Sequence, residues 1–195
     1  MRYFIDPPLV AAGVCLWRLI YLIVYALTGA DPLTAWVVYA GYNVPEDVRM
    51  EALRRMGLRP DLEAELAEIL ATENTNWTRE GLLLITTIPF KPSTRLEQPV
   101  RAALAVVSEE IRQRPATDTR DGDRAVDLYE THALRSTLGV AERMADGAGI
   151  DFSAAIEIMQ QAVAASPTSE AARSFPGQAA ATKARIAAIL APRHD

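Results

Sequence analysis

Cysteine, histidine and lysine are scarce in this 195-residue chain. It has one cysteine, Cys15, two histidines, and lysine only at positions 91 and 183. A single cysteine excludes an intramolecular disulfide framework and a cysteine-rich metal site. With 50% apolar residues and only 10 Gly and 12 Pro, the chain is neither disordered nor of low complexity. Its length fits one domain, or one domain with an appendage.

The sequence also lacks the usual signatures of enzymes. It contains no GxGxxG and no GKS or GKT phosphate loop. His132 follows Asp127 and Glu130 by five and two residues, and neither offset places the pair on one helical face. The acidic loop Asp118–Asp123 does not match the calcium-loop pattern, because threonine and leucine occupy ligand positions. We therefore expect a non-enzymatic protein with no catalytic residues, no cofactor and no metal site.

Positive charge is not concentrated anywhere along the chain. Residues 1–43 carry four charged side chains that sum to zero, residues 44–115 have a net charge of −2, and residues 116–195 have a net charge of −3. A nucleic-acid binder would present a basic surface, so we expect no nucleic-acid partner. The preference for Arg over Lys and the abundance of Ala are typical of a GC-rich genome, which indicates a bacterium or a bacterial virus.

Residues 9–29, LVAAGVCLWRLIYLIVYALTG, form the most unusual segment. As a helix they would extend roughly 31 Å, close to the ~30 Å hydrocarbon core of a bilayer. Arg18 lies near the middle and would cost about 2.5–3.5 kcal/mol to insert, whereas the ten Leu, Ile and Val residues return roughly 3–6 kcal/mol. The net free energy is therefore slightly favourable to insertion of this helix into a membrane. The alternative is a core helix of a soluble protein, with Arg18 extended to the surface.

Aromatic side chains gather at the same end of the chain. Eight of the thirteen aromatic residues lie in the first 42 positions. Trp17, Tyr21 and Tyr25 recur every four residues and so form one stripe of a helix, with Arg18 beside it. A second apolar run, residues 33–42, is too short to span a bilayer and predicts the other arm of a helical hairpin. The candidate interface residues are Trp17, Arg18, Tyr21, Tyr25, Trp36 and Tyr39.

The remainder of the chain predicts a series of amphipathic helices. The clearest apolar stripe recurs every three or four residues and consists of Leu96, Val100, Leu104, Val107 and Ile111. Residues 81–89 fit either a buried strand or a helix, and we favour helix because no second strand is available for pairing. Residues 114–123 predict a polar linker. We expect Ser153 to cap one helix, residues 166–177 to form a broken turn region, and a last helix to cover about 178–191.

We expect an all-α fold: a hydrophobic anchor or assembly arm (residues 1–43), a helical region (44–115), and a C-terminal helical region (116–195) after the linker. The leading hypothesis is a structural or accessory subunit of a larger homo- or hetero-oligomeric assembly, membrane-associated in a bacterium and in contact with lipid through residues 9–29. The alternative is a soluble scaffold component of a large particle, such as a phage virion or tail, or of a cytoplasmic assembly. In that case the apolar arm packs between neighbouring subunits.

Overall fold

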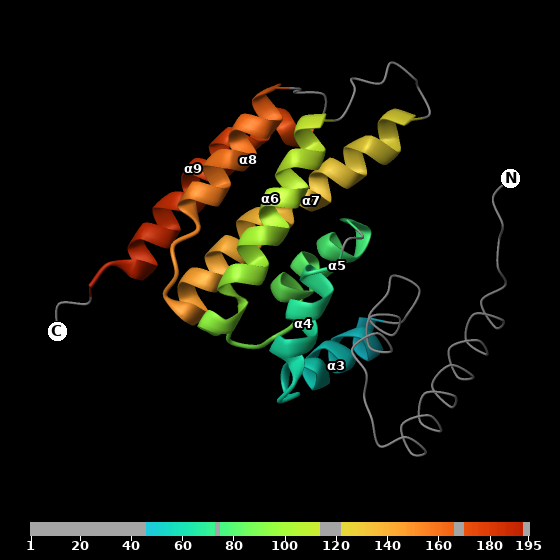
Figure 1. Cartoon of the computed structure of the whole chain (residues 1–195), viewed down its shortest axis with the longest axis vertical. Helices are drawn as coiled ribbons and strands as arrows, with labels where there is room; N and C mark the ends of the chain where they lie inside the picture. The colour runs from blue at the N-terminus through green and yellow to red at the C-terminus, as the bar shows by residue number, and fades with distance from the viewer. Residues whose placement is uncertain (1–45, 73–74, 114–121, 166–169, 193–195) are drawn as a thin grey trace, which may run out of the picture. The chain divides into compact units, whose positions relative to one another are not determined.

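The structure is a computed structural model that describes residues 46–72, 75–113, 122–165 and 170–192 (Figure 1). Within these ranges the chain forms seven α-helices and one 3-10 turn, and no strand. The expectation of an all-α fold is confirmed for this part of the chain. The predicted anchor and all six candidate interface residues lie outside it. The contacts divide the chain into two compact units, residues 1–59 and residues 60–195.

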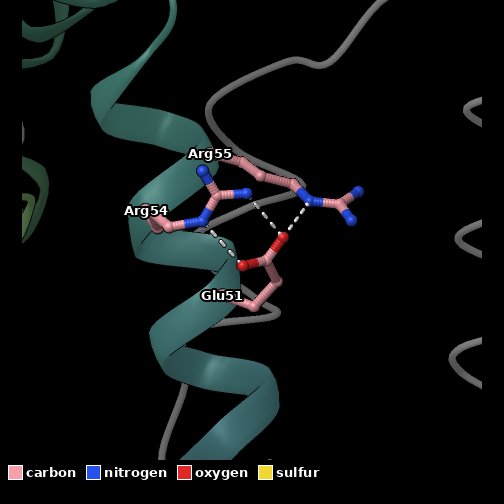
Figure 2. A network of polar contacts seen from close by, with 3 residues as sticks. All are labelled: Glu51, Arg54 and Arg55. Carbon is pink, nitrogen blue, oxygen red and sulfur yellow. Dashed lines mark hydrogen bonds and ion pairs between the residues drawn. The ribbon is translucent and has the colours of Figure 1, made fainter.

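The first unit contributes one described helix, α3 (Glu46–Gly57). Arg54 and Arg55 lie in its last turn, where cations favour the helix dipole. Both donate to the carboxylate of Glu51 (Figure 2). Arg54 forms a two-pronged contact, with Nε 2.8 Å from Oε2 and Nη2 3.0 Å from Oε1, and Arg55 Nε lies 2.7 Å from Oε1.

The second unit begins with α4 (Leu62–Leu70) and α5 (Thr75–Thr87). Leu62, Leu66 and Leu70 are buried at helical spacing. Asp61 occupies the N-cap position of α4, but its side chain makes no capping hydrogen bond. The prediction of helix rather than strand for residues 81–87 is correct, since they form the second half of α5.

Three longer helices follow. A 3-10 turn, η1 (Thr94–Leu96), leads into α6 (Glu97–Gln113), and α7 (Gly122–Ala148) and α8 (Ser153–Ala165) come next. All five residues of the predicted stripe are buried in η1 and α6. The prediction that Ser153 caps α8 is wrong, because Ser153 is the first residue of the helix. The capping side chain is Asp151, whose Oδ1 accepts a hydrogen bond from the Ser153 amide at 2.8 Å.

The last helix, α9 (Glu170–Leu190), contradicts the prediction of a broken turn up to position 177. Pro176 lies inside the helix, although proline removes an amide donor and crowds the carbonyl four residues earlier. The proline itself is exposed, whereas the preceding Phe175 is fully buried. Burial of a whole aromatic ring therefore outweighs the local cost of the proline.

The helices of the second unit form two rows. α4, α6 and α8 pack against one another in one row, and α5, α7 and α9 in the other. Neighbours within a row run parallel. Arg101 of α6 contacts Asp151 before α8 and Ser108 contacts Met159, while on the other side Arg143 of α7 contacts residue 88 and Gly147 lies against Pro92.

Candidate functional site

The connection between α5 and η1, residues 88–93, is the best candidate for a binding site in the described part of the chain. Its sequence, IPFKPS, contains two prolines, which restrict its backbone. Ile88 and Pro92 are buried, whereas Pro89 and Lys91 are exposed. The segment therefore presents alternate residues to solvent from a stiff backbone.

Glu63 of α4 holds the end of this segment. Its carboxylate accepts a hydrogen bond from the Ser93 amide at 2.5 Å and another from the Ser93 hydroxyl at 2.6 Å. The Ser93 hydroxyl oxygen in turn accepts from the Arg95 amide and so caps η1. These contacts bridge residues thirty positions apart and fix where the segment meets α6.

The C-terminal end of α7 packs against Pro92 of the same segment. A Cβ placed on Gly147 would lie 2.6 Å from Pro92 Cδ and 2.8 Å from Pro92 O, so only glycine allows this approach. Two residues later Gly149 adopts a φ of 69°, a left-handed conformation that favours glycine and ends the helix.

Arg143 joins α7 to the same segment. Its Nη2 donates to the carbonyls of Ile88 and Phe90, each at 2.6 Å, and its guanidinium carbon lies 5.6 Å from the centre of the Phe90 ring. Burial lowers the pKa of Arg143, and the nearby Asp146 carboxylate acts in the opposite direction. Nε is buried without a hydrogen-bond partner, whereas Nη1 takes part in neither of these hydrogen bonds and is not fully buried.

An open depression of about 480 Å³ lies over these residues. It is lined by Pro89, Phe90, Lys91, Pro92, Arg143 and Asp146. The lining combines two prolines and an aromatic ring with two cations and one carboxylate. Such a surface is suited to binding an anion that carries an apolar group, and we see no nucleophile paired with a base among these six residues.

Of the residues considered earlier for metal or acid–base chemistry, Glu130 and His132 differ in burial. Glu130 is buried, at 3% exposure, whereas His132 two positions later on α7 is exposed. This separation confirms that the two side chains do not share a helical face. Within the described residues no group of three or more His, Cys, Asp or Glu side chains could hold a metal ion. Cys15 and the loop containing Asp118 and Asp121 lie outside the described ranges.

No pattern in the sequence indicates the Arg143 site. Arg143 lies 53 and 55 residues from its two carbonyl partners. Every residue type has a main-chain carbonyl, so the sequence does not mark these acceptors. Pro92 and Gly147 are common turn residues, and their contact depends on how α7 packs beside α5.

In comparisons with known proteins, no family model, curated protein or solved structure matches the chain. Among the helices of the described residues, none combines the length and apolarity required to cross a bilayer.

Proposed function

We propose that this protein is a non-enzymatic subunit of a larger assembly, anchored in a membrane through residues 9–29, with the two-row helical unit as its protein-binding part. The observation that supports this best is an exposed apolar pair on adjacent helices. Val106 of α6 and Ile158 of α8 are each 45% exposed. Most large apolar side chains of the unit are buried, and we take these two exposed ones as candidate contacts with another protein.

The register of α6 and α8 brings these two side chains to the same level. Ser108 Oγ lies 3.8 Å from Met159 Sδ, and Val106 and Ile158 precede these residues by two and one positions. Small apolar residues extend the exposed surface around them: Ala102, Ala105 and Ala154.

The charge distribution supports the anchor. Residues 1–43 have four charged side chains and eight aromatic ones, which is costly in water unless lipid or protein covers them. An arginine in the middle of a membrane helix faces protein or water and needs a carboxylate or carbonyl partner. On this proposal Arg18 meets such a partner in another subunit.

Alkaline carbonate extraction of membranes tests the anchor. The full-length protein is compared with a chain that begins at Val44, and we expect only the full-length protein to remain in the washed membrane. Replacement of Arg18 by Leu should leave insertion intact and weaken assembly. Release of the full-length protein by carbonate would contradict the anchor.

The alternative, a soluble scaffold component whose apolar arm packs between subunits, makes a different prediction. The full-length protein would form stable oligomers without lipid or detergent. Size-exclusion chromatography with light scattering, in the absence of detergent, separates the two proposals.

The apolar pair has its own test. Val106→Lys together with Ile158→Lys should remove co-purification with partner subunits while the protein stays folded, as judged by circular dichroism. Ile189→Lys on α9, where Ile189 is 38% exposed, is the matched control in the other row. Loss of partners by the control alone would contradict the assignment of this surface.

A further inference from the structure

We infer that the depression over residues 89–92 and α7 is a binding site for a carboxylate that carries an adjacent apolar or aromatic group. This inference rests on the geometry of the second unit alone. It holds whether or not residues 9–29 enter a membrane.

The cations of the depression are available to an anion. Arg143 lines the depression, and its hydrogen bonds to the two carbonyl oxygens use Nη2 and not Nη1. Lys91 is exposed and forms no ion pair with any acidic side chain in the described ranges. Two cations face one carboxylate, Asp146, so the lining has a net positive charge.

The apolar part of the lining suits the rest of such a ligand. The Phe90 ring already lies beside the Arg143 guanidinium, and the exposed Pro89 provides a rigid apolar surface in the same lining. A carboxylate on Arg143 and Lys91 would place its neighbouring apolar group over Phe90 and Pro89. Partial burial of Arg143 strengthens the attraction, because a desolvated guanidinium is poorly screened by water.

The site is also preorganised. Glu63 accepts hydrogen bonds from Ser93, and Pro92 packs against Gly147. Arg143 donates hydrogen bonds to two carbonyls of the segment. A ligand therefore does not have to order the loop when it binds, which reduces the entropic cost of association.

The same chemistry could come from a free organic acid or from the carboxylate of a protein chain. Two probes separate these sources. The first is 3-phenylpropanoate, with neutral 3-phenylpropanamide as its control. The second is the peptide acetyl-Ala-Phe with a free C-terminal carboxylate, with its amidated form as control.

Binding is measured by NMR titration of the full-length protein in a mild non-ionic detergent, followed on the Arg143 side chain and the Phe90 ring. We expect saturable shifts with both carboxylates and none with the neutral controls. Tighter binding of the peptide assigns the site to a protein chain, and tighter binding of the free acid assigns it to a small molecule. Absence of saturable shifts, or equal shifts with the neutral probes, would overturn the inference.

Three substitutions check the roles of the charged groups. Lys91→Gln should weaken carboxylate binding about three- to fivefold, and Asp146→Asn should strengthen it about two- to threefold. Lys183→Gln, which removes a half-buried lysine on α9 that pairs with Glu157 away from the depression, should have no effect on carboxylate binding and serves as the control. Weaker binding by Asp146→Asn, or no change in Lys91→Gln, would contradict a carboxylate site. Lys91 is exposed, so this result does not depend on a variant that disturbs the fold.

Discussion

Gly147 and Pro92, residues from two segments that lie far apart in the sequence, approach so closely that the contact leaves no space for a methyl group. A Cβ on Gly147 would come within 3 Å of three Pro92 atoms, two of them in the backbone. The segment that lines the candidate site therefore depends on a hydrogen atom at this position of α7.

The first prediction follows from this contact. Gly147→Ala should lower the free energy of unfolding by roughly 1–3 kcal/mol, because overpacking outweighs the gain of ~1 kcal/mol in helix propensity. Gly177→Ala on α9 is the matched control. A Cβ there would meet nothing within 4 Å, so this variant should gain about 0.5–1 kcal/mol. Equilibrium unfolding in denaturant measures both changes, and a more stable Gly147→Ala variant would refute the contact.

Glu130 provides the second prediction. It is 3% exposed, and its Oε2 is buried with no hydrogen-bond partner. Replacing a poorly compensated buried charge by an apolar residue of similar volume is often stabilising, so Glu130→Met should raise the free energy of unfolding by about 1–3 kcal/mol.

The control for Glu130 is Glu142→Met on the same helix. Glu142 is partly exposed and pairs with Arg185, with Oε1 3.0 Å from Arg185 Nε. Its replacement should cost no more than about 1 kcal/mol, as expected for a surface ion pair. Destabilisation of the Glu130 variant by more than its control would show that Glu130 has an ionic partner.

The third prediction concerns the start of α8. Hydrogen bonds from the Ser153 amide and hydroxyl to Asp151, supported by the charge of Arg101, lower the pKa of the Asp151 carboxyl. Asp151→Ala should cost about 0.5–2 kcal/mol at neutral pH, as for other lost N-caps. Because the folded pKa is lowered, this difference is complete above the ordinary range of aspartate and disappears as the pH falls through the folded pKa. A difference that persists unchanged at pH 2 would contradict the cap.

The fourth prediction concerns Glu51 on α3. Hydrogen bonds from Arg54 first, and from Arg55 second, lower the pKa of Glu51 to about 2. NMR titration should therefore show Glu51 ionised at pH 3, where an ordinary glutamic acid is protonated. Arg54→Ala should raise the pKa of Glu51 further toward its ordinary value than Arg55→Ala does, and Arg112→Ala on α6 should leave it unchanged. An equal effect of the two α3 variants would contradict the two-pronged contact with Arg54.

The local sequence predicts the helices well because each one buries an apolar stripe with its own period. The run from Leu96 to Ile111 is the clearest example, and all its members are buried. The start of α9 could not be predicted in this way, because Pro176 is a local signal for a break and the burial of Phe175 depends on the rest of the unit.

The candidate site was not predictable for a related reason. Its cation comes from α7, its carbonyls from the end of α5, and its supporting carboxylate from α4. Tertiary packing alone brings these three segments together, and no spacing of residues along the chain predicts their contact. The predicted interface of residues 17–39 and its membrane role remain predictions.

The two-row arrangement has a consequence for how this protein folds. α6 packs most extensively against α8, and α7 packs most extensively against α9, so for these two helices the main partner is synthesised only after an intervening helix. Contacts of this kind close long loops, and a high average sequence separation between contacting residues slows folding. An isolated hairpin such as α6 with α7 gains little by itself. We therefore expect folding to be slower than in a bundle of the same length whose sequential helices pair, with the rate-limiting step at the arrival of the third helix.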